Sequence, residues 1–145
     1  MKKIIDKKVT QLKMKYHTKN PFELCENLGI EILYENLGKN INGFYQAAPR
    51  NKVIHININL DEYSRYFTCS HELGHALFHS KLNILFLEKN THIIKNKYEN
   101  EANYFSANLY LSDENLYSDK FSGMTIEQIA AQLHIPIELL KLKLK

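Results

Sequence analysis

Apolar residues recur along this chain in two different periods. Spacings of three and four residues, the period of an amphipathic helix, mark the N-terminal segment and several later ones. The helices expected from this spacing cover residues 2–17, 21–28, 61–80 and 97–111, with a C-terminal pair at 125–134 and 136–144. These segments predict a mainly helical body.

Capping residues support the start or end of several of these helices. Asn20 precedes a proline, a combination typical of a helix start, and Gly29 is placed to end the short helix that follows. Asp61 is a candidate N-cap for the long central helix. Thr125, followed three residues later by a glutamine, has the sequence of a capping box.

Alternation with a period of two predicts three strands, at residues 30–34, 43–47 and 53–58. In the third strand the isoleucines would face one way, and His55 would face the other way, toward solvent. We therefore expect an α+β fold in which a small three-stranded antiparallel sheet with one buried face packs on the helical body.

Composition places the chain among ordinary globular proteins. It has 145 residues, 44% hydrophobic and 24% charged, which favours a single domain over residues 1–145. The net charge is +3, from 19 basic and 16 acidic residues, and the basic excess lies mainly at the two ends. Such ends are typical of solvated helix termini, so we expect no direct binding to nucleic acid.

Cysteine content and hydropathy argue against a secreted or membrane protein. Cys25 and Cys69 are the only cysteines, too few for a disulfide scaffold, and we expect Cys69 to be a small buried apolar residue of the central helix. No apolar run approaches the roughly 18–20 residues of a membrane span, and the N-terminus lacks the pattern of a signal peptide. The cytoplasm is the expected location.

The sequence His71-Glu72-Leu73-Gly74-His75 carries the candidate chemistry. This H-E-x-x-H pattern on a helix places two imidazoles on one face, where both can bind one metal ion. Glu72 would act as general base on a metal-bound water. Gly74 inside a helix costs about 1 kcal/mol relative to alanine, which suggests close approach of a neighbouring element.

A catalytic metal site of this type needs a third protein ligand. The helix expected at 97–111 offers Glu99 and Glu101. Small and polar residues share the face of Glu99, which favours it as the ligand, but Glu101 remains open. Asn103, one turn on, would orient His71 or His75. For His79, a role in orienting a ligand or at the helix C-terminus is favoured over a place as a fourth imidazole near the metal.

Two segments together resemble the ImmA/IrrE family of metallopeptidases. Phe67–His79 resembles the family's metal helix, and Glu99–Leu111 resembles its second signature, E-x-x-A-N-x-F-A-x-x-L-L. The resemblance implies a zincin-like domain, a Zn2+ site of His71, His75 and Glu99, and Glu72 as general base. It also implies a bacterial or phage protein, since family members on mobile elements cleave or inactivate a helix-turn-helix repressor.

The resemblance therefore implies a zinc-dependent endopeptidase that cleaves such a repressor and thereby acts as an antirepressor. We expect residues 1–111 to form the catalytic core and 112–145 a C-terminal helical segment. Tyr45, His55 and His79 are the candidate oxyanion donors. The alternatives are a non-proteolytic metal-binding module that sequesters a repressor or binds DNA, and a metal hydrolase of small molecules. A divalent ion other than zinc and any oligomeric state remain compatible with the sequence.

Overall fold

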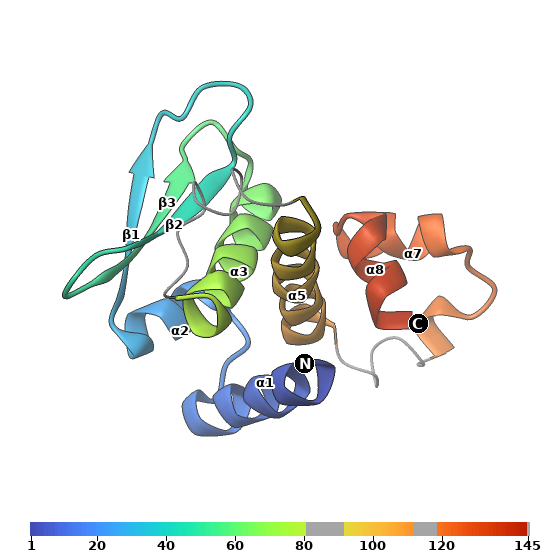
Figure 1. Ribbon diagram of the computed structural model, residues 1–145. Helices are drawn as coiled ribbons and strands as arrows, with labels where there is room; N and C mark the ends of the chain where they lie inside the picture. The colour runs from blue at the N-terminus through green and yellow to red at the C-terminus, as the bar shows by residue number, and fades with distance from the viewer. Residues whose placement is uncertain (81–91, 112–118, 145) are drawn as a thin grey trace.

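The structure, a computed structural model, describes residues 1–80, 92–111 and 119–144, with only the backbone described at 92–95. These residues form six α-helices, one 3-10 helix and one three-stranded sheet (Figure 1). The helices are α1 (Lys2–Tyr16), α2 (Pro21–Leu28), α3 (Glu62–Phe78), α5 (His92–Tyr110), η1 (Asp119–Phe121), α7 (Ile126–Leu133) and α8 (Ile137–Leu144), and the strands are β1 (Ile30–Glu35), β2 (Gly43–Ala47) and β3 (Lys52–Asn57). The expected α+β composition is confirmed.

Helix α3, which carries the H-E-x-x-H sequence, lies between the sheet and helix α5 (Figure 1). One side of α3 contacts β2 and β3, and the other side packs along α5. Helices α1 and α8 both pack against α5, and α7 packs against α8. The two helices that carry the candidate metal ligands are therefore direct neighbours.

The capping residues predicted from the sequence are confirmed. The side chain of Asn20 accepts hydrogen bonds from the first backbone N–H groups of α2, and Gly29 ends this helix with φ of 72°. Asp61 accepts a hydrogen bond from the backbone N–H of Ser64, at 2.7 Å, and so caps α3. Thr125 forms the expected capping box at the start of α7. Each cap satisfies N–H groups that a helix end leaves without an intrahelical partner.

Helix α5 begins earlier than the sequence pattern predicted. The apolar residues at 81–96 show no regular spacing, so we predicted an irregular segment there and a helix that begins near Lys97, but the helix starts at His92. No glycine or proline lies between His92 and Tyr110, so nothing in the sequence stops the helix there. Residues 81–91, which belong to the segment predicted to be irregular, lie outside the described residues. Among the helices of the described ranges, none is both long and apolar enough to cross a membrane.

The prediction of an antiparallel sheet was wrong, because the sheet is mixed. Its order is β1-β3-β2, with β1 parallel to β3 and β2 antiparallel to β3. Strands β2 and β3 form a hairpin, but the chain leaving β1 crosses to the far edge before β2 begins. Strand β3 therefore inserts between its predecessors, a pairing that alternation within single strands does not encode.

The central position of β3 also corrects the expectation that His55 is solvated. His55 is only 8% exposed, because Leu33 of β1 and Phe44 of β2 lie beside it in the register. Its ring stacks on Phe44, and its two nitrogens contact Glu35 at 2.5 Å and Gln46 at 2.8 Å. A histidine on the outer face of a central strand is thus enclosed by its neighbours on both sides.

Asn57, at the end of β3, holds the crossover loop that leads from β1 to β2. Its Nδ2 donates to the carbonyl oxygens of Gly38 and Ile41 at 2.8 and 2.7 Å. Its Oδ1 accepts from the backbone N–H groups of Leu37 and Asn59. Asn57 is buried, and these four bonds satisfy the polar atoms of its amide. They fix the path of the loop that determines the strand order.

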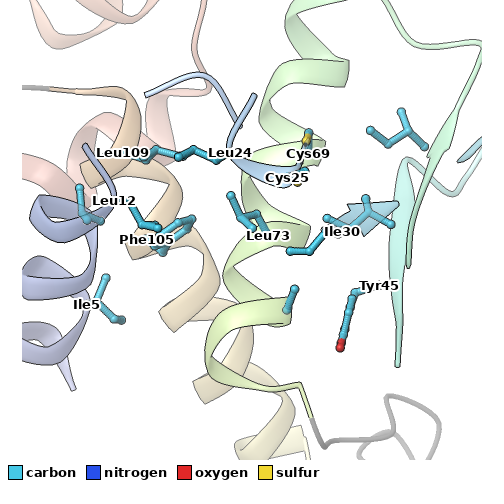
Figure 2. Packing of buried hydrophobic residues seen from close by; sticks show 14 residues of the cluster. Ile5, Leu12, Leu24, Cys25, Ile30, Tyr45, Cys69, Leu73, Phe105 and Leu109 are labelled. Carbon is cyan, nitrogen blue, oxygen red and sulfur yellow. Dashed lines mark hydrogen bonds between the residues drawn. The ribbon is translucent and has the colours of Figure 1, made fainter. Parts of the chain in front are cut away.

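The main hydrophobic core lies on both sides of α3 (Figure 2). Leu73 occupies its centre, fully buried between the inner face of the sheet and α5. The predicted burial of Cys69 is confirmed. Cys25 is buried beside it, with the two Sγ atoms 4.0 Å apart and both thiols free. The residues labelled in the figure are Ile5, Leu12, Leu24, Cys25, Ile30, Tyr45, Cys69, Leu73, Phe105 and Leu109.

A second, smaller cluster joins the C-terminal helices to this body. Leu111, Ala130, Ile135 and Leu140 are its buried members, and Phe67 of α3 packs against it. The cluster thus connects residues from α3 and the end of α5 with residues of α7 and α8. Burial of such side chains is worth about 1.5–3 kcal/mol for each large aliphatic one, so α8 is held firmly beside α5.

Glycine permits two close approaches to α3. A Cβ at Gly74 would lie 3.1 Å from the Cα of Ala102 on α5. A Cβ at Gly43 would lie 2.5 Å from the backbone oxygen of His55 and 2.6 Å from Cγ2 of Thr68. The close approach expected at Gly74 is therefore present, and Gly43 lets β2 fit tightly between β3 and α3.

We expect Gly43→Ala to lower the free energy of unfolding by about 1–3 kcal/mol, the usual cost of overpacking. The added Cβ would collide with both the His55 carbonyl and Thr68, so β2 would have to move. Chemical denaturation measures the loss. Thr68→Ser removes the methyl group and should restore part of the stability in the double variant, with Thr68→Ser alone as the control. Equal stability of Gly43→Ala and the wild type would contradict this packing.

Candidate metal centre

Three side chains from two helices converge on one point. His71 and His75 come from α3 and Glu99 comes from α5, and one ligand atom of each lies within 4.8 Å of the other two. The Nε2 atoms of the two histidines are 3.2 Å apart. The Glu99 carboxylate contacts both, with Oε2 3.0 Å from His71 and Oε1 2.9 Å from His75.

The sequence produces this convergence through two local features. The i, i+4 spacing puts both histidines on one face of α3. Gly74, between them, lets the backbone of α5 approach at Ala102, which lies one turn after Glu99. The short distance between the helices brings a glutamate side chain within reach of both imidazoles.

Each of the two histidines has a different partner on its outer nitrogen. His71 places Nδ1 2.7 Å from Oδ1 of Asn103. His75 places Nδ1 2.9 Å from Nδ1 of His79, whose Nε2 is 3.3 Å from Oε1 of Glu101. Asn103 thus lies where the sequence analysis expected it, and His79 contacts a metal-facing histidine from behind.

These contacts determine where the protons lie. An amide oxygen accepts hydrogen bonds, so His71 donates from Nδ1 to Asn103. Burial and the nearby His75 lower the pKa of His79, which favours its neutral form. If His79 donates from Nε2 to the carboxylate of Glu101, its Nδ1 accepts from His75. Both metal-facing histidines then carry their protons on the outer nitrogens and direct lone pairs inward from Nε2.

The inner atoms form a donor set that suits a metal cation. Two imidazole lone pairs and a carboxylate face one another at 2.9–3.2 Å, an arrangement that repels itself without a positive charge between the groups. Two histidines and one glutamate are also the protein ligands of catalytic zinc sites that keep one position open. The residues present therefore fit a bound divalent ion.

Glu99 and His71 compensate each other electrostatically. Burial alone would raise the pKa of Glu99, but its hydrogen bonds to His71 and His75 outweigh burial and hold the pKa far below its ordinary value. Burial lowers the pKa of His71, yet the contact with Glu99 prevails and the pKa is raised. Without a metal ion, a proton on His71 supplies part of the positive charge that the cluster requires.

Glu72 lies at the edge of the cluster and is 7% exposed. Its Oε2 is 3.9 Å from Nε2 of His71. Burial raises the pKa of Glu72 above its usual range, although His71 and His75 act in the opposite direction and the backbone N–H of Tyr45 donates to the carboxylate. A buried carboxylate of raised pKa beside a metal site is the arrangement expected of a general base.

Glu101, the alternative ligand considered from the sequence, faces away from the convergence point. It is 8% exposed and binds His79, and its Oε2 has no hydrogen-bond partner among the described residues. Sequence reasoning missed this role of Glu101. The sequence did contain a signal for this role. His71, His75 and His79 are spaced by four residues, so His79 lies one turn beyond His75 on the same side and needs a partner of its own.

The three candidate oxyanion donors are not gathered at the cluster. His55 lies on the opposite face of the sheet from α3, and both of its ring nitrogens have partners, so the structure removes it from the site. His79 is buried behind His75. The hydroxyl of Tyr45 donates to the carbonyl of Ser80 at 3.4 Å, and it is the backbone of Tyr45 that contacts Glu72.

Comparisons with known proteins agree with this geometry. Residues 25–145 match the family described as IrrE N-terminal-like domain. The uncharacterized immunity region protein 2 of Bacillus phage phi105 is 41% identical over 140 residues, which covers 97% of this chain and 89% of the phage protein. Metallopeptidase ImmA of Bacillus subtilis strain 168 is 35% identical over 136 residues, which covers 91% of this chain and 79% of ImmA.

A solved structure shows the same fold. A Mycobacterium tuberculosis transcriptional regulator aligns with 97% of this chain at a TM-score of 0.64 and 16% sequence identity. This chain spans about half of that one, 46% of its length. At this level of identity the similarity concerns the fold alone.

We expect Glu101→Ala to lower the affinity for Zn2+ about 10–100-fold, the usual effect of removing a group that orients a metal ligand. Without Glu101, His79 loses its acceptor and no longer holds His75 in one orientation. Competition with a chromophoric chelator measures the affinity. Glu101→Gln keeps an acceptor oxygen and should bind nearly as tightly as the wild type. An unchanged affinity in Glu101→Ala would exclude this orienting role.

In the metal-free protein, the contacts of Glu99 should stabilise the fold in a limited pH range. The lowered pKa of Glu99 gives stability above the ordinary carboxyl value of about 4.3, which is lost as pH falls. The raised pKa of His71 gives stability below the ordinary histidine value of about 6.5, which is lost as pH rises through the raised pKa.

The difference in melting temperature between the wild type and Glu99→Gln, measured in a chelator from pH 4 to 9, should therefore be largest between these values. It should shrink on both the acidic and the alkaline side. A difference that is constant over the whole range would show that the contacts of Glu99 with the two histidines do not stabilise the fold.

Proposed function

The chain belongs to the ImmA/IrrE family of metallopeptidases, and we propose that it is a zinc-dependent endopeptidase that cleaves a helix-turn-helix repressor. The observation that carries this proposal is the convergence of His71, His75 and Glu99 beside the buried carboxylate of Glu72. A structural metal site has no use for a carboxylate held next to its ligands, whereas hydrolysis requires one.

We assign the metal to Nε2 of His71, Nε2 of His75 and the carboxylate of Glu99. We favour zinc because two histidines and one glutamate are a ligand set of zinc peptidases, although manganese or another divalent ion fits the same atoms. When bound, the ion polarises the scissile carbonyl and lowers the pKa of water. Asn103 and the pair His79–Glu101 keep the two imidazoles pointed inward.

Glu72 acts as the general base in this proposal. Its carboxylate takes a proton from the attacking water and delivers it to the nitrogen of the leaving amine. Burial keeps Glu72 out of bulk water, so the proton it receives stays available for the leaving group.

Strand β2 provides a surface for the substrate backbone. It is an edge strand of the sheet and packs against α3. An extended peptide can pair with the outward N–H and C=O groups of an edge strand, and this pairing would align the peptide with the metal centre. An extended, flexible segment of a protein substrate fits this mode of binding better than a folded surface does.

The repressor is proposed as substrate because of the family and the phage relative. That relative is named an immunity region protein of a phage, which agrees with the substrate that the family implies. The antirepressor role, and the cytoplasm of a bacterial host as its place, belong to this proposal. The protein would release gene expression by destroying the repressor.

We also propose that residues 1–145 form one domain, with a catalytic core at 1–111 and a helical segment at 112–145. The cluster that joins α7 and α8 to α3 and α5 supports this arrangement. The burial of Leu139 and Leu140 agrees with it, because one face of α8 packs on the body of the protein.

Glu72→Gln should reduce repressor cleavage about 10²–10⁴-fold, because it removes the general base but leaves the metal ligands in place. The test incubates a candidate helix-turn-helix repressor with each variant and follows fragments by gel electrophoresis and mass spectrometry. Metal content, measured by atomic emission, should equal that of the wild type. Glu62→Gln, an exposed change on the same helix α3, is the matched control.

A chelator should abolish cleavage, and Glu99→Ala should lose both metal and activity. Equal cleavage by Glu72→Gln and the wild type would contradict the assignment of Glu72 as the general base. A different outcome would favour the binding module over the peptidase. In that outcome the protein inhibits the repressor stoichiometrically, no fragments form, and Glu72→Gln inhibits as well as the wild type.

A further inference from the structure

One cavity connects the metal centre with the C-terminal helix α8. Its volume is about 370 Å³, within the lower range of sites that hold small ligands or single side chains. His71 and Glu72 line it on the side of the metal centre, and Leu139 and Glu138 line it on the side of α8. A substrate residue next to the bond under attack would thus place its side chain between α3 and α8.

The walls of this cavity carry apolar, neutral polar and charged side chains. Phe67 of α3 and Leu139 of α8 offer apolar surface, and Pro136 lies directly before α8. The neutral polar residues are Asn42, Thr68, Asn103 and Ser106. Glu138 is exposed, in the first turn of α8. A side chain that enters the cavity can therefore pack an aliphatic stem on the apolar wall and reach solvent beside a carboxylate.

The charge of the cavity is negative outside the metal cluster. Among the described residues that line it, none is lysine or arginine, and Glu138 forms no ion pair within the described part of the chain. The N-terminus of α8 contributes about half a positive charge, which the full negative charge of Glu138 exceeds. The net field at this end of the cavity favours a cation.

We propose that this cavity is a specificity pocket for a long basic side chain, lysine or arginine, adjacent to the cleaved bond. The stem of the side chain lies between Phe67 and Leu139, and its cationic end pairs with Glu138. This inference rests on the proposed function, since the pocket selects a substrate only if the neighbouring centre cleaves one. It makes α8 a part of the substrate site.

Peptide hydroxamates test the pocket without requiring cleavage. A hydroxamate binds the metal, and the side chain beside it enters the adjoining pocket. Two compounds are compared by calorimetry on the zinc-loaded protein, one with lysine and one with norleucine, which has the same aliphatic stem without the charge. The ratio of the two affinities is independent of the fraction of folded or metal-loaded protein.

The wild type should bind the lysine compound about two- to fivefold more tightly, the gain expected for an ion pair near the surface. Glu138→Gln should bring the ratio to about one, and Glu138→Lys should invert it. Glu127→Gln is the matched control, because Glu127 is an exposed acid in the first turn of α7, as Glu138 is in α8, and does not line the cavity. It should keep the wild-type ratio.

Equal affinities for the two compounds in the wild type, or a lysine preference that persists in Glu138→Gln, would overturn the proposal. Failure of both compounds to bind would contradict the metal centre and the pocket together. A preserved lysine preference in a protein that cleaves no repressor would contradict only the proposed function.

Discussion

The close packing of α3 on α5 is the constraint on which the rest of the site depends. Two histidines four residues apart need a third ligand from another element, and that element must come near enough for a glutamate to reach both. Gly74 permits this, with a hypothetical Cβ only 3.1 Å from the backbone of Ala102. A larger residue would gain helix propensity, worth about 1 kcal/mol, but would push Glu99 away from the imidazoles. Gly74 therefore lowers the stability of the helix interior but makes the geometry of the centre possible.

Hydrogen bonds behind the two histidines complete what the packing begins. Asn103 and His79 bind the outer nitrogens, so the inner nitrogens present lone pairs to a metal. The chain from His75 through His79 ends at Glu101, deep between α3 and α5. The same two helices that supply the ligands therefore supply the groups that orient them. Asn103 and Glu101 share α5 with Glu99, so a shift of this helix would disturb ligand and orienting groups together.

The sheet and the C-terminal helices contribute the surroundings of the centre. Strand β2 gives a backbone N–H to Glu72 and an edge on which a peptide can pair. Helix α8 closes one side of the adjoining cavity, although it lies far along the chain from the H-E-x-x-H sequence. The cluster around Leu140 holds α8 there. Helix α8 is thus a wall of the cavity beside the candidate metal centre.

The sequence by itself determined the helices with their caps, the three strands, the row of two histidines and the preference for Glu99, because each depends on residue order within a few turns. Tertiary structure decided the rest. Alternation identifies a strand without identifying its neighbours, so the mixed order β1-β3-β2 and the burial of His55 followed only from the crossover loop held by Asn57. The pairing of Glu101 with His79, which are 22 positions apart, and the place of Glu138 in the wall of the cavity likewise depended on packing between elements distant in the chain. Local patterns specify which side chains share a face, and only packing specifies which faces meet.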